Sequence, residues 1–344
     1  MNFKIAILSI LISGSLNAQI EDSRGVHQQW RTDLQRASVD LSGFMAIIKR
    51  DGTPPIDHPE FWSIQEAEER FNSLEPVIVF SNSYETRAYP LSILMYHEIV
   101  NDTVGDDTVG DDYISVTFCP LCNASIVYNR QVEYDNLIHL LDFGVSGMLR
   151  GSDLVMWDRQ TESWWQQLTG EALVGEMLGA ELEVMESAII SYDEFKALYP
   201  DGKVLARPDD LMEYGKNPYV DYDQAENRPS LFEGEIDERL PPMERIVNVF
   251  GVGGNVVYPW SVIEEIRVLN HSRAGEDLVI FYTEGMNSVL DRESIADSRD
   301  DGMVRVFSRR IAYEVYEGQA LTFYEENGVF KDVQTKSILS FSGR

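Results

Sequence analysis

The feature that most constrains the fold is an internal repeat, in which two sequence signatures recur in the same order. The segment Arg87–Ser92 resembles Val256–Ser261 around a shared Tyr-Pro pair, and Asp158–Ser163 resembles Asp332–Ser337 around a shared Asp-x-Gln-Thr-x-Ser pattern. The proline and the aspartate are 68 residues apart in the first case and 73 residues apart in the second. Ordered matches at similar spacing predict two copies of one module, at residues 71–200 and 241–344, of which the second is shortened.

The secondary structure expected within the first copy is mainly β. Short apolar runs bounded by turn residues predict strands at the following segments: 76–80, 86–89, 114–118, 124–128, 137–143 and 154–157. The run 91–100 has helical spacing after its proline, and 192–199 is expected to form a second short helix. No βαβ alternation is present, so we predict an α+β fold, mainly β, with short helices.

The N-terminal residues have the pattern of a secretory signal peptide. Lys4 precedes the apolar run 5–12, which is too short to span a bilayer, and small residues follow up to a cleavage position near Ala18. The expected order is a signal peptide (1–18), an N-terminal segment (19–70), the first module (71–200), an acidic, proline-containing connector (201–240) and a degenerate second module (241–344). The mature chain is therefore expected in a periplasm or outside the cell, with no membrane anchor.

The composition predicts a globular protein with a strongly acidic surface. Apolar residues make up 44% of the chain, enough for a substantial core, and the formal net charge is −30. Such a charge repels phosphates, so nucleic acid is not an expected partner. The acidic segment 102–106 is copied directly at 107–111. It lacks the ligand spacing of an EF-hand, and we predict a duplicated exposed loop.

Three reactive side chains occur in the first copy but not in the second. The alignment of the two copies gives the following pairs: Cys119 and Tyr282, Cys122 and Gly285, His97 and Ile266. A scaffold that keeps its turns and loses three such side chains suggests that they form one site. The second copy would then have a structural or regulatory role.

The first interpretation of this site is metal binding. Cys119 and Cys122 are the only cysteines in the chain, and thiolates together with the His97 imidazole suit copper(I) or zinc. Met156 is a candidate fourth ligand, and Met148 is another thioether. The candidates for residues around the metal are Asp158, Trp165 and His139. The partner expected for such a site is an unidentified redox or metal-transfer protein, and the reaction is not indicated by the sequence.

Two other interpretations of the Cys-Pro-Leu-Cys sequence stay open. Thiol–disulfide exchange fits a Cys-x-x-Cys sequence after a strand, although the following segment 124–128 has a strand pattern and not the helix pattern of thioredoxin. A structural disulfide between Cys119 and Cys122 fits an oxidising compartment, in a binding or scaffold protein without catalysis. So small a loop would stabilise the fold by roughly 2 kcal/mol in the chain-entropy model.

A set of motifs along the chain resembles the domain of unknown function 3179 family. The segments that carry the resemblance are 51–55, 87–91, 97–102, 118–122, 143–147, 154–159 and 165–172. The resemblance covers roughly residues 43–344, and it implies an exported bacterial or archaeal protein with no established reaction.

Overall fold

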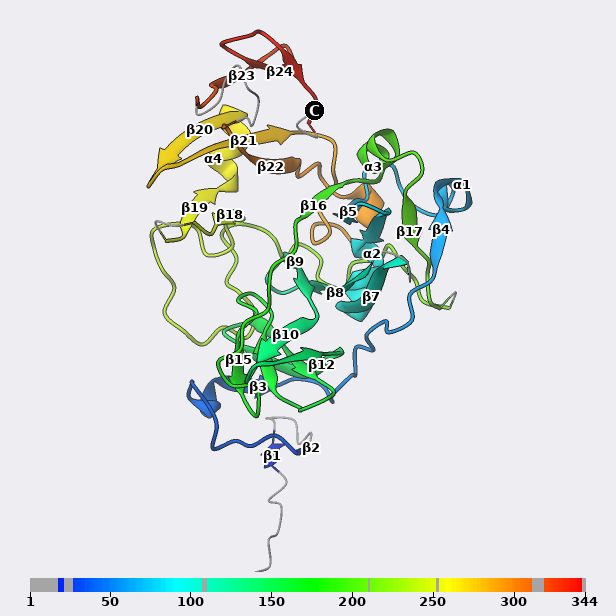
Figure 1. Cartoon of the computed structure of the whole chain (residues 1–344), viewed down its shortest axis with the longest axis vertical. Helices are drawn as coiled ribbons and strands as arrows, with labels where there is room; N and C mark the ends of the chain where they lie inside the picture. The colour runs from blue at the N-terminus through cyan, green and yellow to red at the C-terminus, as the bar shows by residue number, and fades with distance from the viewer. Residues whose placement is uncertain are drawn as a thin grey trace, which may run out of the picture.

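Figure 1 shows the computed structural model of the chain, which describes residues 18–21, 27–106, 110–209, 211–251, 254–310 and 319–341. The expected signal peptide, apart from Ala18, lies outside these residues. The described residues form many short strands and four short α-helices, and the prediction of a mainly β, α+β fold is confirmed. The paired strands are antiparallel, except that β17 is parallel to β6. Among the described helices, none is both long enough and apolar enough to cross a bilayer.

In the first half of the chain, the described residues 18–205 form two five-stranded sheets and three smaller ones. One five-stranded sheet has the order β15 (Ala172–Val174), β14 (Trp164–Gln166), β13 (Asp153–Asp158), β12 (Phe143–Arg150), β3 (Phe44–Ala46). The other has the order β16 (Ser187–Ser191), β5 (Pro76–Ser81), β6 (Thr86–Pro90), β17 (Lys203–Leu205), β4 (Phe61–Ser63). A three-stranded sheet follows the order β7 (Ile99–Asp106), β8 (Gly110–Cys119), β9 (Ala124–Asn129), and β10 (Gln131–Tyr134) pairs with β11 (Leu137–Leu140).

The second half of the chain forms smaller antiparallel sheets, which lie at the opposite end of the molecule from β3 and β15 (Figure 1). Their orders are β18 (Ile246–Val249) and β19 (Val256–Pro259); β20 (Val268–Arg273), β21 (Glu276–Thr283) and β22 (Met303–Ser308); and β23 (Phe323–Glu326), β24 (Val329–Asp332) and β25 (Ile338–Leu339). At the N-terminus, β1 (Ala18–Glu21) pairs with β2 (His27–Trp30).

The helices are short because their sequence signals lie close together. Helix α2 (Leu91–His97) begins after Pro90 and is followed by its cap residue Glu98, whose N–H donates the last helical hydrogen bond to the Leu94 carbonyl oxygen. The φ of 58° at Glu98 turns the chain out of the helix. The remaining helices are α1 (Ile64–Ala67), α3 (Tyr192–Leu198) and α4 (Trp260–Ile266), with 3₁₀ turns at Leu41–Gly43 and Ile295–Asp297. The predicted helix 91–100 is therefore too long at its C-terminal end, because Ile99 already begins β7.

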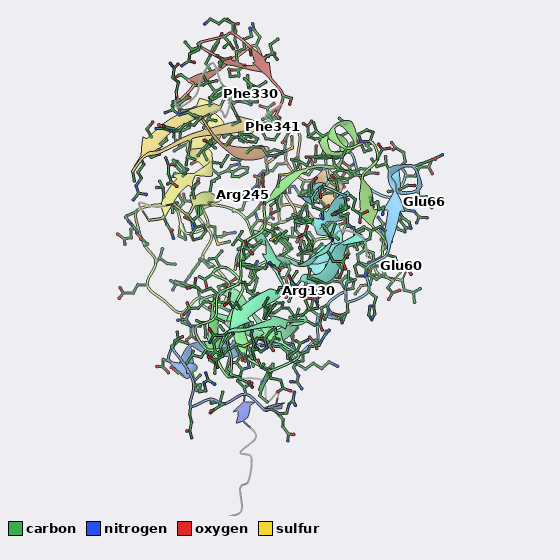
Figure 2. All side chains as sticks on the ribbon, in the orientation of Figure 1. Glu60, Glu66, Arg130, Arg245, Phe330 and Phe341 are labelled. Carbon is green, nitrogen blue, oxygen red and sulfur yellow. The ribbon has the colours of Figure 1, made fainter. Side chains whose placement is uncertain are left out.

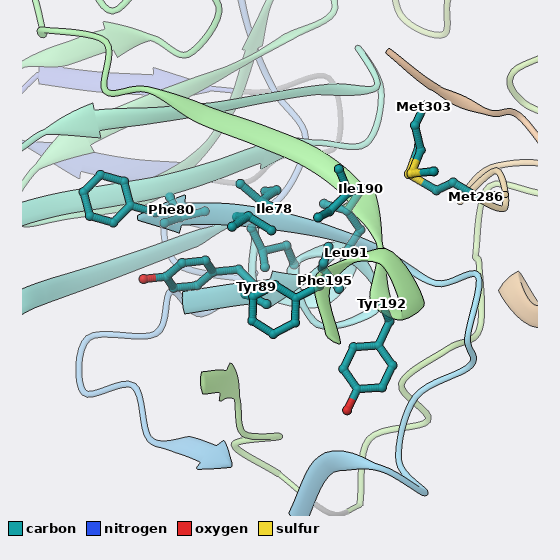
Figure 3. Packing of buried hydrophobic residues seen from close by; sticks show 14 of the residues in the cluster. Ile78, Phe80, Tyr89, Leu91, Ile190, Tyr192, Phe195, Met286 and Met303 are labelled. Carbon is teal, nitrogen blue, oxygen red and sulfur yellow. The ribbon is translucent and has the colours of Figure 1, made fainter. Parts of the chain in front are cut away.

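The largest apolar cluster contains side chains from both halves of the chain. Around β5, β6, α2 and α3 it includes Ile78, Tyr89 and Phe195, and Figure 3 shows Met286 and Met303 beside Ile190. It continues to Phe330 in β24 and to Phe341 after β25, and Figure 2 labels both residues. The two halves therefore share a core.

Two other sequence expectations differ from the structure. The predicted strand 137–143 is divided between the whole of β11, two residues outside any strand, and the first residue of β12. The acidic segment 102–106 is the end of β7 and not an exposed loop. Asp102 in it is 4% exposed and accepts hydrogen bonds from Arg87 and Tyr89, so the prediction was wrong there because buried partners make a carboxylate acceptable inside a strand.

Candidate functional site

The Cys-Pro-Leu-Cys segment forms a tight turn that brings the two thiols together. Cys119 is the last residue of β8, and the N–H of Cys122 donates to its carbonyl oxygen at 3.2 Å. Asn123 has a positive φ of 48° and returns the chain into β9, where Ala124 pairs with Cys119. The two Sγ atoms are 2.8 Å apart, and both cysteines are free thiols.

Asp153 is the third member of a group of ionisable side chains that also contains the two thiols. It is the first residue of β13, directly after the turn at Gly151 and Ser152, and its Oδ1 accepts the Cys122 thiol at 3.1 Å. The ligand atoms of Cys119, Cys122 and Asp153 all lie within 4.8 Å of one another. Cys119 and Asp153 are buried and Cys122 is half-buried, so Cys122 is the most accessible member.

The second carboxylate oxygen of Asp153 is held by neutral donors. Gln166 donates its side-chain amide to Oδ2, and the backbone N–H of Leu168 donates to the same atom at 3.0 Å. Among the described residues, no Lys, Arg or His forms an ion pair with Asp153. The carboxylate is therefore oriented by hydrogen bonds but its charge is not compensated by the protein.

Without a metal, the surroundings of the three side chains favour their protonated forms. The hydrogen bond to Cys119 and burial raise the pKa of Cys122, and the nearby Asp153 carboxylate raises it further. Burial raises the pKa of Asp153. A divalent cation would displace these protons and supply the missing positive charge, because thiolate and carboxylate are the forms that bind metals.

His97 is placed outside this group of three. Its Nδ1 lies 2.8 Å from the Pro54 carbonyl oxygen and its Nε2 lies 2.8 Å from the Tyr214 hydroxyl oxygen. Burial lowers the pKa of the imidazole. Both ring nitrogens therefore have protein partners, and coordination of a metal would require one of these hydrogen bonds to break.

The two methionines lie on opposite faces of the β12–β13 sheet. Met156 is fully buried in the apolar cluster that also contains Cys119, Tyr128 and Trp165. Met148 belongs to the separate cluster around Trp164. Of these two methionines, Met156 is therefore the one that shares a cluster with the cysteines.

Some of the residues predicted to surround the metal lie near the cysteines, and others do not. Trp165 donates its indole N–H to Asp158 at 2.9 Å, and Trp165 also lies in the apolar cluster of Cys119. Asp158 accepts further hydrogen bonds from Thr161 and Ser163 within its own turn. His139 lies instead in the β10–β11 hairpin, opposite Val132.

Sequence reasoning missed Asp153, although a signal was present. An aspartate at the start of an apolar strand, directly after a Gly-Ser turn, is a charged residue at a position that a sheet normally buries. The predicted strand 154–157 begins directly after this aspartate. The contact itself could not be predicted, because 31 residues separate Asp153 from Cys122.

The comparisons with known proteins give a family but no activity. No curated protein and no solved structure matches the chain. A family model described as a protein of unknown function (DUF3179) matches residues 50–343, which is nearly the whole chain. The chain therefore belongs to the DUF3179 family.

Proposed function

We propose that this chain is an exported metal-binding protein, and that Cys119, Cys122 and Asp153 bind one metal ion. The observation that carries the proposal is the convergence of two thiols and an uncompensated buried carboxylate within 4.8 Å. Three protein ligands leave a fourth position for water, a substrate or Met156. An open position of this kind is typical of catalytic or transfer sites and not of purely structural ones.

The ligand chemistry favours zinc over copper(I). Two thiolates suit both metals, but a carboxylate oxygen is a hard ligand that zinc accepts and copper(I) disfavours. Zinc–sulfur bonds of about 2.3 Å in tetrahedral geometry place two sulfur atoms about 3.7 Å apart. The Sγ atoms of Cys119 and Cys122, at 2.8 Å, would therefore separate by about 1 Å on binding.

Thiol–disulfide exchange is the second candidate, and the same distance favours it. The Sγ–Sγ separation of 2.8 Å would need to shorten by somewhat less than 1 Å to reach a disulfide bond of about 2.05 Å. Cys122, the more accessible thiol, would attack a disulfide of a partner protein and release one partner thiol, with Asp153 accepting the Cys122 proton. Cys119 would then displace the second partner thiol, so that the partner disulfide is reduced as Cys119–Cys122 is oxidised. The raised pKa of Cys122 weakens this candidate, because the thiolate is the nucleophile.

We also propose that the two halves of the chain are copies of one module. Several residue pairs are separated by the same 169 positions and have similar surroundings: Glu75 and Glu244, Tyr89 and Tyr258, Ser92 and Ser261, Asn101 and Asn270. Asn101 exchanges two hydrogen bonds with the backbone of Phe143, and Asn270 exchanges two with Phe323. Repeated long-range hydrogen bonds of this kind support a common origin more strongly than sequence matches alone.

A second pair of equivalent hydrogen bonds, both between backbone groups, shifts the alignment around the cysteines by one residue. The N–H of Phe118 donates to the carbonyl oxygen of Glu98, at the end of α2, and the N–H of Tyr282 donates to that of Arg267, at the end of α4. Tyr282 therefore corresponds to Phe118, and Cys119 corresponds to Thr283. The second copy still lacks both a thiol and an imidazole at these positions.

The metal proposal is tested on the mature protein, purified without chelators and analysed for bound metals and free thiols. We expect near-stoichiometric zinc in the wild type, its loss in Cys119→Ser, strong reduction in Asp153→Asn, and retention in His97→Gln. Loss in His97→Gln with retention in Asp153→Asn would support the ligand set predicted from sequence instead. Absence of metal after reconstitution of the reduced protein would refute metal binding, and a reversible loss of both thiols would then favour exchange.

A further inference from the structure

The connector contacts both the candidate site and the second half of the chain. At Tyr222, the backbone N–H donates to the Leu290 carbonyl oxygen at 3.2 Å, and the side-chain hydroxyl donates to the Leu121 carbonyl oxygen at 3.2 Å. Leu121 lies inside the Cys-Pro-Leu-Cys turn, directly before Cys122. One residue of the connector therefore links the turn to the second half.

A continuous path of hydrogen bonds runs from Tyr222 to the other side of the site. The Tyr222 hydroxyl accepts the backbone N–H of Ser230 at 3.0 Å, and the Ser230 carbonyl oxygen accepts the Ser152 hydroxyl at 2.6 Å. Ser152 directly precedes Asp153. The path thus joins the residue before Cys122 to the residue before Asp153, and the bond between Cys122 and Asp153 closes it into a ring.

We propose that Tyr222 is a positioning residue, which sets the spacing between the cysteine turn and Asp153 and through which the second half of the chain supports the site. This inference rests on the proposed metal function. A metal ion needs its ligand atoms at fixed separations, and Asp153 and the cysteines come from different sheets. The Tyr222–Ser230–Ser152 path is a hydrogen-bonded connection between those two sheets that does not pass through the ligands themselves.

The geometry also explains why a tyrosine is suited to this place. Its hydroxyl donates to Leu121 and accepts from Ser230 at the same time, so phenylalanine would keep the ring and lose both bonds. The ring of Tyr222 is half-buried and packs at 6.2 Å from the ring of Tyr219. Removal of the hydroxyl should therefore leave the connector packed and free only the site to rearrange.

The test measures zinc affinity of the mature chain by competition with a chromophoric chelator, and the absorption of Co²⁺ bound in place of zinc. We expect Tyr222→Phe to weaken zinc binding about tenfold, at the lower end of the range for residues that orient metal ligands, and to change the ligand-field bands of Co²⁺. Tyr96→Phe is the matched control. Its hydroxyl also donates to a connector carbonyl oxygen, that of Lys216 at 3.0 Å, but it takes no part in the Tyr222–Ser230–Ser152 path.

A second variant keeps the test decisive if Tyr222→Phe folds poorly. Ser152→Ala breaks the other end of the same path, so it should weaken zinc binding to a similar extent. The double variant should lose no more than either single one, because both act on one connection. Zinc affinity within twofold of the wild type in both single variants would overturn this inference alone. Failure of the wild type to bind zinc or Co²⁺ would overturn both this inference and the proposed function.

Discussion

Glu75 provides a quantitative test of the packing between β5 and α2. Its side chain is 5% exposed and accepts a hydrogen bond from the hydroxyl of Ser92 in α2. Burial raises the pKa of Glu75 from 4.5 to about 7. The folded state therefore holds a proton that the unfolded chain releases, and Glu75→Gln should remove that difference while keeping an oxygen for Ser92.

The sign and size of the effect follow from the two pKa values of Glu75. Because the folded state binds the proton more tightly, stability is greatest below pH 4.5 and falls as the pH rises through about 7. Between about pH 5.5 and pH 8.5 this contribution changes by about 2 kcal/mol, since one pKa unit corresponds to about 1.4 kcal/mol. The variant should therefore gain about 2 kcal/mol relative to the wild type over that interval.

The assay is urea unfolding of the wild type and Glu75→Gln at the two pH values. Glu244→Gln is the matched control, because Glu244 is half-buried and accepts the backbone N–H of Ser261 at 2.9 Å. A constant difference between the wild type and Glu75→Gln at both pH values would refute the argument that burial controls this carboxyl group.

Three further outcomes are expected. Gly147→Ala should destabilise the fold by roughly 3 kcal/mol in chemical denaturation, because Gly147 has a φ of 76° and an added Cβ would clash with the Ile48 carbonyl oxygen. A change below about 1 kcal/mol would contradict this. Asp158→Asn should lower the free energy of unfolding by roughly 2–4 kcal/mol in the same assay. The fully buried carboxylate accepts hydrogen bonds from N–H donors, and an amide NH₂ in its place would face those donors. Unchanged stability would show that the turn rearranges. Zinc binding should weaken as the pH falls, because protons compete with the metal for Cys122, whose pKa is raised by the bond to Cys119 and by burial. The amount of bound zinc is measured as a function of pH, and constant occupancy down to about pH 5 would contradict thiolate ligation.

The parts of the fold that depend on local signals could be predicted from the sequence. The β5–β6 hairpin, the start of α2 after Pro90, the strand β9 and the helix α3 follow from apolar runs, prolines and turn residues close to them in the chain. The end of α2 could not be predicted, because Glu98 adopts a positive φ that is rare for a glutamate. Its backbone geometry is stabilised by β7 and β8, which pack against it only in the folded chain.

The candidate site shows the same division between local and long-range information. The proximity of Cys119 and Cys122 is a local property of a four-residue turn, and the sequence was sufficient to predict it. The third member, Asp153, lies in the site because β13 approaches that turn in the folded chain. The pattern of apolar residues along the sequence does not predict this approach. His97 was the more obvious ligand by residue type, and the hydrogen bonds to Pro54 and Tyr214 account for its imidazole without a metal.

The second half of the chain makes contacts that support both the core of the first half and the candidate site. It contributes Met286 and Met303 to the core around Ile190, and its Leu290 carbonyl oxygen accepts the backbone N–H of Tyr222. Removal of the second half would therefore expose part of that core and release the residue that joins the two sides of the site. These contributions come from apolar side chains and a backbone carbonyl oxygen, so the second half supports the first without a thiol or an imidazole of its own.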